Sequence, residues 1–212
     1  MGHLILVRHS TTGASAGGRN LGQASDPPLA GTGVALAGRL GTSLRAELEQ
    51  LPVDLLRLVS SPARRCRQTA AAVGRAIGRP DASEVDARLV EIDYGAWEGL
   101  TEAECMARDP ERRTAWEADP FTVRIPGGES GSEVASRAFP AFDAIDAWLA
   151  ADRARVAVVV SHNHVIRLRL TALLGWPMAA YRRRLEQDPA GYSIVRVDAG
   201  RPLFRRLNVL PA

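Results

Sequence analysis

No lysine occurs in this chain of 212 residues, so all 27 basic side chains are arginines. They are offset by 24 acidic side chains, which leaves a net charge of +3. Nucleic-acid-binding proteins usually cluster their basic residues and interleave aromatic ones, whereas here the arginines are scattered among acids and only 5% of residues are aromatic. We therefore expect no nucleic-acid partner. The one tight basic cluster, Arg182-Arg183-Arg184, is interpreted as a solvated helix face.

Cysteine is almost as scarce as lysine. Cys66 and Cys105 lie far apart along the chain, which indicates neither a disulfide framework nor a zinc site. No apolar run reaches the roughly 18 residues of a membrane span. The first residues lack the long apolar run and cleavage site of a signal peptide, and Leu6 stands where a myristoylation signal needs Ser or Thr. We expect a cytoplasmic protein with no membrane partner, no metal and no cofactor.

Two apolar runs of strand length end in a polar residue followed by a histidine. Leu4 to Val7 is followed by Arg8 and His9, and residues 156–160 are followed by Ser161 and His162. Ligands of open α/β sheets bind at the carboxyl ends of the strands. Two of the chain's four histidines are therefore predicted at that edge.

The other segments predict alternating helices and strands. Residues 13–28 are interpreted as a loop, 29–50 and 63–77 as helices, 55–59 as a strand and 89–100 as an ordered loop. One or two short helices follow, then a long helix over 132–151 kinked at Pro140, a helix over 165–174, and a hairpin formed by 192–197 and 202–207.

The helix predicted over 63–77 has an unusual first turn. Ser61 is interpreted as its cap, and Pro62 suits its start. The next residues include Arg64, Arg65 and Arg67, although the helix dipole favours anions at this end. Either the arginines are exposed to solvent, or an anionic ligand such as phosphate binds there.

Five motifs in this order resemble those of the histidine phosphatase superfamily, in the branch that includes the cofactor-dependent phosphoglycerate mutases. They extend from Leu6 to about Leu174. The motifs are Leu6-Val7-Arg8-His9, Ser60-Ser61-Pro62 with Arg65 and Gln68-Thr69-Ala70, Glu91 with Gly95 and Trp97-Glu98-Gly99, Gly128-Glu129-Ser130, and Val160-Ser161-His162 with Val165-Ile166-Arg167.

The resemblance implies an α/β fold, a three-layer sandwich whose central, mostly parallel mixed sheet is flanked by helices. It further implies a single domain over residues 1–212, in which a helical and loop insertion at about 91–128 caps the site. The implied activity is that of a metal-independent phosphomonoesterase, which hydrolyses a small phosphorylated metabolite through a phosphohistidine. The partner would be a small phosphate ester, and a homodimer is possible.

The resemblance also assigns catalytic roles to five residues. His9 would be the nucleophile, since a neutral imidazole avoids repulsion by a phosphate dianion. Arg8 and Arg65 would bind the phosphoryl oxygens as permanently charged forks, with His162 as a further donor. The family spacing selects Arg65, with the adjacent arginine as the alternative if the helix register differs. Glu91 would protonate the leaving oxygen as a carboxyl of raised pKa.

Some other polar positions depart from the family pattern or have no catalytic role in it. Ser15 stands where the family often has an asparagine that contacts phosphate, and Asn163 replaces a glycine, so both are candidate phosphate-binding residues. Ser10 replaces glycine or alanine, and its hydroxyl is expected near the phosphoryl group or the acid. His164 is interpreted as lying beside the site, and His3 as a surface residue.

Two alternatives stay open. A phosphoglycerate mutase would need further basic contacts, and Arg112-Arg113 lie in the right region, but the segment between Trp97 and Gly128 lacks the mutase's proline-rich pattern. A non-catalytic phosphate-recognition module would need neither a nucleophile nor an acid. We therefore favour hydrolysis.

Overall fold

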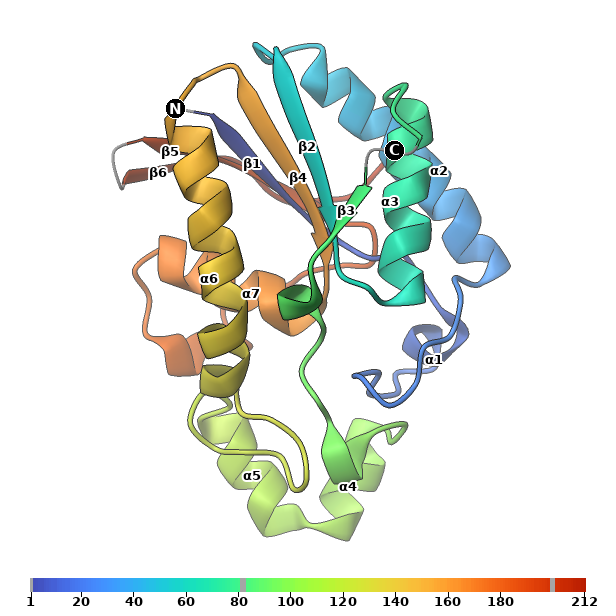
Figure 1. Cartoon of the computed structure of the whole chain (residues 1–212). Coiled ribbons are helices and arrows are strands. Elements are labelled where there is room, and N and C mark those ends of the chain that lie inside the picture. Colours follow the sequence, from blue (N-terminus) through green and yellow to red (C-terminus); the bar gives the residue numbers. More distant parts are fainter. Residues whose placement is uncertain (1, 81–82, 199–200) are drawn as a thin grey trace.

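The computed structural model describes residues 2–80, 83–198 and 201–212, which contain a six-stranded sheet at the centre of the molecule (Figure 1). Its strand order is β3-β2-β4-β1-β5-β6. The first four run parallel, β5 is antiparallel to β1, and β6 is antiparallel to β5. The strands are β1 (His3–Arg8), β2 (Leu55–Ser60), β3 (Ser83–Val85), β4 (Arg155–Ser161), β5 (Tyr192–Asp198) and β6 (Arg201–Val209).

Helices cover both faces of this sheet, which confirms the predicted α/β class. Helices α2 (Gly31–Leu48) and α3 (Arg64–Ala76) pack on one side, and α6 (Gly131–Ala150) and α7 (Asn163–Leu173) pack on the other (Figure 1). Alternate residues of β1 supply the two cores. Leu4 and Leu6 face α6 and α7, whereas Ile5 and Val7 face α2 and α3. A strand buried on both faces reads as one continuous apolar run.

The shorter elements lie beyond the carboxyl ends of the parallel strands. Helices α4 (Glu102–Arg108) and α5 (Pro110–Ala118) form the lower end of the molecule in Figure 1, and they match the predicted short helices. The segment over 13–28 is not entirely loop, since it begins with the short helix α1 (Gly13–Ala16). The remaining elements are the 3-10 helices η1 (Ala87–Leu89), η2 (Gly95–Trp97) and η3 (Met178–Ala180).

The predicted long helices differ from the observed ones by a few residues at their ends. Pro140 lies within α6, which continues on both sides of it. The predicted C-terminal hairpin is present as antiparallel β5 and β6, and the turn expected at residues 199–200 lies outside the described residues.

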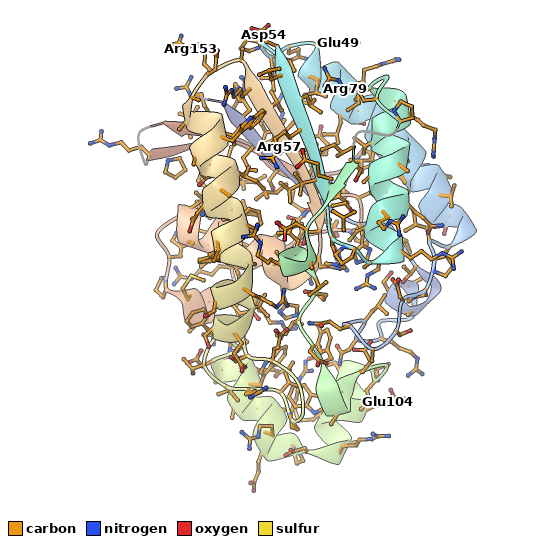
Figure 2. All side chains as sticks on the ribbon, viewed as in Figure 1. Glu49, Asp54, Arg57, Arg79, Glu104 and Arg153 are labelled. Carbon is orange, nitrogen blue, oxygen red and sulfur yellow. The ribbon has the colours of Figure 1, made fainter. Side chains whose placement is uncertain are left out.

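Charged side chains such as Glu49, Arg79 and Glu104 lie on the outside (Figure 2).

Cys66 and Cys105 are both free and buried, in agreement with the expectation of no disulfide framework. No helix among the described residues has the length and apolar character that a bilayer span requires.

Candidate active site

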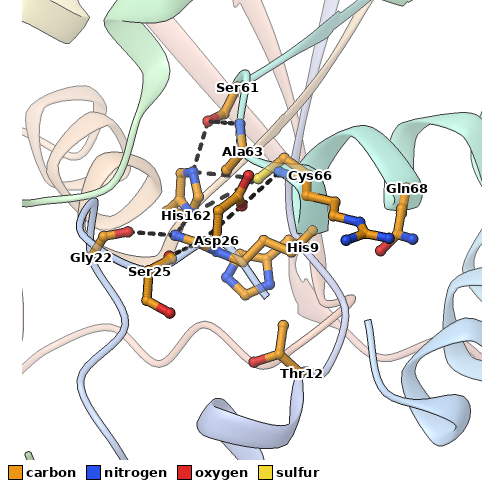
Figure 3. A network of polar contacts seen from close by, with 12 residues as sticks. His9, Thr12, Gly22, Ser25, Asp26, Ser61, Ala63, Cys66, Gln68 and His162 are labelled. Atoms are coloured by element: carbon orange, nitrogen blue, oxygen red, sulfur yellow. Dashed lines mark hydrogen bonds and ion pairs between the residues drawn. The ribbon is translucent and has the colours of Figure 1, made fainter. Parts of the chain in front are cut away.

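The register of β1 and β4 brings the two strand-end histidines together. Arg8 is paired with Ser161, so the next residue of each strand is a histidine. The backbone N–H of His9 donates to the Ser161 carbonyl at 2.9 Å. The ring centroids of His9 and His162 are 5.2 Å apart at an interplanar angle of 65°, and both rings are buried in the network of Figure 3.

A single hydrogen bond fixes the tautomer of His9. Its Nδ1 lies 2.7 Å from the Ser10 carbonyl oxygen, which can only accept, so Nδ1 carries the proton and Nε2 keeps its lone pair. Burial, and then the charges of Arg8 and Arg65, hold the pKa of His9 well below its usual value. The ring is therefore a neutral imidazole, with Nε2 free to attack an electrophile.

The second imidazole, His162, has its proton on the other nitrogen. Arg65 Nη2 lies 3.2 Å from Nδ1, and a guanidinium can only donate, so Nδ1 accepts. Nε2 then donates to the Ser61 hydroxyl at 2.8 Å (Figure 3). Burial, followed by the charge of Arg65, keeps the pKa of His162 well below its usual value.

Ser61 is not the helix cap predicted from the sequence. Helix α3 is preceded by Ala63, which has no side-chain cap, and the Ala63 N–H is 3.4 Å from the Ser61 hydroxyl. The hydroxyl instead accepts from His162 at 2.8 Å and so orients this ring. Cys66 packs beside the same ring, and burial raises the pKa of its thiol.

The two adjacent arginines differ in their surroundings. The side chain of Arg65 is 1% exposed and lies against the imidazole of His162, whereas Arg64 is exposed. Arg65 also donates to the Gly22 carbonyl at 2.9 Å, and it lies 3.7 Å from an Asp26 carboxylate oxygen (Figure 3). The loop after α1 therefore folds over this guanidinium.

Glu91 lies at the same end of the sheet and is buried. Its Oε1 accepts from the backbone N–H of Ile92 at 2.9 Å and from that of His164, in the first turn of α7, at 3.3 Å. Burial raises the pKa of this carboxyl, although the two N–H groups and the charges of Arg65 and Arg8 oppose the shift. A raised pKa is what the sequence-based role as a proton donor requires.

An arginine of α6 holds the backbone around Glu91. Arg137 donates to the carbonyls of Arg88, Val90 and Glu91 at 2.7–2.9 Å. Its other contacts are with the Glu129 carboxylate, at 2.8 and 2.9 Å. All five N–H groups of the guanidinium are therefore used.

The glycine of the Gly128-Glu129-Ser130 motif allows this arrangement. A Cβ on Gly128 would lie 2.2 Å from the Asp93 carbonyl oxygen and 2.8 Å from the Gly95 nitrogen. The Glu129 carboxylate also accepts from the Asp93 N–H at 2.9 Å. The motif thus packs against the segment that follows Glu91 and positions it.

His164 lies behind Glu91 and is buried, in agreement with its expected place beside the site. Its Nε2 is 2.8 Å from the Tyr94 hydroxyl, and its Nδ1 is 2.7 Å from the Tyr181 hydroxyl. Burial, and then the charge of Arg182, hold the pKa of His164 well below its usual value. A neutral ring can donate to one tyrosine and accept from the other.

A cavity of about 230 Å³ adjoins these residues. It is lined by Arg8, His9, Ser15, Gly18, Arg19, Asn20, Leu21, Glu91, Tyr94, Glu102, Arg113, Asn163 and Arg182. A second hollow of about 220 Å³ lies on the Arg65 side of Glu91. The larger hollow of about 640 Å³ around Arg64 and Arg67 contains none of the predicted site residues. The described residues include no group of three or more His, Cys, Asp or Glu side chains that could bind a metal ion.

Two predictions about single side chains were wrong. The Ser10 hydroxyl donates to the Gly33 carbonyl at 2.7 Å, so it is not the expected contact to the phosphoryl group or to Glu91. His3 was expected on the surface, yet it is 4% exposed, because its strand is buried over most of its length.

The two proposed phosphate contacts at Ser15 and Asn163 stay predictions. Both residues line the cavity with His9. The Ser15 hydroxyl bonds within its own turn, to the Thr12 N–H at 2.9 Å. The Oδ1 atom of Asn163 is buried and has no hydrogen-bond partner.

The interpretation of Arg182-Arg183-Arg184 as a solvated helix face was also wrong. This segment is a turn that follows η3, not a helix. The Arg182 side chain lines the cavity, and its guanidinium carbon lies 4.3 Å from the centroid of the buried Trp116 ring. The following two arginines are exposed, as expected.

Two neutral imidazoles, two arginines and a carboxyl of raised pKa thus lie at the carboxyl edge of a mixed α/β sheet, an arrangement suited to phosphoryl transfer. A family model described as "Histidine phosphatase superfamily (branch 1)" matches residues 4–210. The chain therefore belongs to the histidine phosphatase superfamily, which confirms the resemblance seen in the sequence.

Named relatives support hydrolysis as the activity. The chain is 32% identical to the glucosyl-3-phosphoglycerate phosphatase of Mycolicibacterium vanbaalenii, over 91% of this chain and 90% of that protein. It is also 32% identical to phosphoserine phosphatase 1 of Hydrogenobacter thermophilus, over 97% and 92%. A solved mycobacterial glucosyl-3-phosphoglycerate phosphatase, in complex with VO3, superposes with a TM-score of 0.84 at 28% identity, covering 99% of this chain and 100% of that one. The chain is a phosphoric monoester hydrolase that acts through a phosphohistidine, and the mutase alternative is not favoured.

Proposed function

We propose that His9 is the nucleophile of this hydrolase, that Arg8, Arg65 and His162 bind the phosphoryl group, and that Glu91 transfers the proton. To do so, the Nε2–H of His162 turns from the Ser61 hydroxyl to a phosphoryl oxygen. The observation that carries the proposal is the tautomer of His9, whose Nδ1–H is held by the Ser10 carbonyl at 2.7 Å while Nε2 keeps its lone pair.

In the first step, His9 Nε2 attacks phosphorus, the N–P bond forms and the bond from phosphorus to the ester oxygen breaks. Two neutral rings and two guanidinium groups do not repel a phosphate dianion, and the guanidinium groups stabilise the charge that spreads over its oxygens. Glu91, whose pKa is raised by burial, gives its proton to the leaving oxygen.

In the second step, the Glu91 carboxylate takes a proton from a water molecule, and this water attacks phosphorus. The N–P bond breaks, its electron pair returns to His9 Nε2, and inorganic phosphate leaves. One covalent intermediate thus divides a difficult displacement into two easier ones. None of these steps requires a metal ion.

The cavity of about 230 Å³ favours a small phosphate ester, since pockets for drug-sized ligands typically measure about 300–1,000 Å³. Phosphoserine and glucosyl-3-phosphoglycerate, which appear in the names of the relatives, are the first substrates to test.

The proposal includes a cytoplasmic location, with which two free cysteines are consistent. The segment over 91–128 supplies Glu91, Tyr94, Glu102 and Arg113 to the cavity wall, which supports its proposed role as a cap. The proposal also includes a homodimer, which sedimentation can test.

The experiment is labelling with a ³²P-labelled ester that is quenched in alkaline detergent, combined with steady-state hydrolysis of p-nitrophenyl phosphate. The wild-type protein should carry acid-labile label and release nitrophenol, and His9→Ala should do neither. Undiminished turnover in His9→Ala would refute the proposal.

The neighbouring arginines provide a matched pair of variants. Arg65→Gln removes a buried guanidinium that lies 3.2 Å from His162, whereas Arg64→Gln changes an exposed side chain. We expect kcat/KM to fall at least about a hundredfold for the first, as for the loss of a transition-state donor, and to change less than about twofold for the second. Equal effects would contradict the role given to Arg65.

A further inference from the structure

The cavity beside His9 has more positive side chains than the phosphoryl-transfer chemistry uses. Besides Arg8, its wall includes Arg19, Arg113 and Arg182. These three come from the segment after α1, from α5 and from the turn after η3. Each could offset a negative charge, so it matters which of them already has a carboxylate partner.

Two of the three arginines are paired. Arg19 forms an ion pair with Glu104 at 3.0 Å, and Arg113 forms one with Glu117 at 2.7 Å. Arg182, in contrast, has no hydrogen bond or ion pair with any of the described residues, and its buried Nε has no partner. Burying an unpartnered polar group costs free energy unless something else satisfies it.

Aromatic packing holds Arg182 in place. Its guanidinium carbon lies 4.3 Å from the centroid of Trp116, and that of Arg113 lies 5.0 Å from the same ring. Trp116 is fully buried and packs edge-on against Trp97, with ring centroids 5.4 Å apart. The Arg182 guanidinium therefore loses little conformational entropy when it binds a ligand.

The surroundings of Arg182 carry excess positive charge. Arg167 is half-buried and, like Arg182, forms no ion pair within the described part of the chain. Burial, and then the charges of Arg182 and Arg8, lower the pKa of Arg167 to about 10. The charges of Arg182 and Arg8 thus lie close enough to the Arg167 guanidinium to destabilise its charged form.

We propose that Arg182 binds a second anionic group of the substrate, so that the preferred substrates are small phosphate monoesters carrying a carboxylate or a second phosphate. The proposal rests on the proposed function, because the ester phosphate must occupy the site at His9. A single fixed guanidinium pairs with a carboxylate or phosphate through two parallel hydrogen bonds, and such an anion would relieve the repulsion among Arg8, Arg167 and Arg182.

The test uses pairs of esters that differ by one anionic group. L-phosphoserine is compared with phosphoethanolamine, 3-phosphoglycerate with glycerol 3-phosphate, and fructose 1,6-bisphosphate with fructose 6-phosphate. We expect the wild-type protein to prefer at least one of the more anionic members in kcat/KM. Preference in the first two pairs identifies a carboxylate subsite, and preference in the third identifies a phosphate subsite.

The variant Arg182→Gln should remove this preference. We expect kcat/KM for the more anionic ester to fall about 10- to 100-fold, chiefly through KM, as for the loss of one charge-assisted pair. Hydrolysis of p-nitrophenyl phosphate should change less than about threefold, which also shows that the variant is folded. Arg182→Lys, which keeps the charge but loses the planar fork, should retain part of the preference, and Arg183→Gln, an exposed neighbour, should retain all of it.

The outcomes separate the two proposals. If wild-type protein hydrolyses the esters without preferring any more anionic member, or if Arg182→Gln affects all esters equally, the second anionic subsite is refuted while the proposed function stands. If His9→Ala keeps full turnover, the proposed function itself is refuted.

Discussion

Replacement of Arg137 tests whether the position of Glu91 depends on the hydrogen bonds of one guanidinium. In Arg137→Met an apolar chain of similar length replaces an arginine that donates to three backbone carbonyls and to the Glu129 carboxylate. The carbonyl bonds contribute about 1 kcal/mol each. The ion pair, whose side chains are 22% and 19% exposed, adds less than about 1 kcal/mol. We therefore expect the free energy of unfolding to fall by about 3 to 4 kcal/mol.

Urea denaturation measures this change. The control is Arg45→Met, which breaks a pair with Glu49 whose side chains are 59% and 70% exposed, and which should cost less than about 0.5 kcal/mol. A loss below about 1 kcal/mol for Arg137→Met would mean that the carbonyls find other partners, and the reasoning would be refuted.

A kinetic measurement separates positioning from mere stability. If Arg137 acts through Glu91, then Arg137→Met should slow hydrolysis of alkyl phosphates more than that of p-nitrophenyl phosphate, because nitrophenolate leaves without protonation. In a Glu91→Gln background, Arg137→Met should have little further effect on kcat, since residues that act as a unit are not additive. Additive losses in the double variant would contradict the coupling.

Three further outcomes are expected. Glu91→Gln should lower kcat for alkyl phosphates by about 10²- to 10⁴-fold and kcat for p-nitrophenyl phosphate much less. An equal loss of kcat on both kinds of ester would exclude the role of Glu91 as an acid. Burial lowers the native pKa of His9 and His162, so the unfolded chain binds more protons than the native protein below about pH 6.5. The free energy of unfolding should therefore decline as pH falls from 7 to 5, by up to about 1.4 kcal/mol per pH unit for each ring. A melting temperature that is constant or rises over this range would contradict the expectation. The raised pKa of Glu91 contributes in the opposite direction. Gly128→Ala, whose Cβ would meet the Asp93 carbonyl at 2.2 Å, should cost about 1 to 3 kcal/mol in a chemical melt, and unchanged stability would show that the loop yields.

The strand ends were predictable because their signal is local. A parallel strand buried on both faces reads as a continuous apolar run, so the polar residues Arg8 and Ser161 mark where the two apolar runs end. Arg65 could also have been found from periodicity. It shares the buried face of α3 with Thr69 and Val73, at helical spacing, whereas Arg64 and Arg67 fall on the exposed side.

The contacts that the sequence did not reveal join segments far apart in the chain. Ser61 stands beside a proline before a helix, so the local pattern fits a cap, but its partner His162 comes 101 residues later. Arg182 lies in a run of three arginines that looks like a solvated face. Only the position of Trp116 distinguishes it from its neighbours, and no local pattern encodes that position.

The absence of lysine can be related to the burial of the positively charged side chains at this site. Burial disfavours charge, and a lysine placed there would tend to lose its proton, whereas a guanidinium starts from a pKa so high that it stays charged. Arg167 is an example, since burial and two neighbouring guanidinium groups lower its pKa only to about 10, which is still well above neutral pH. The same burial leaves both His9 and His162 neutral. One environment therefore yields a neutral nucleophile beside fixed positive charge, a combination that attracts a phosphate dianion without protonating the nitrogen that must attack it.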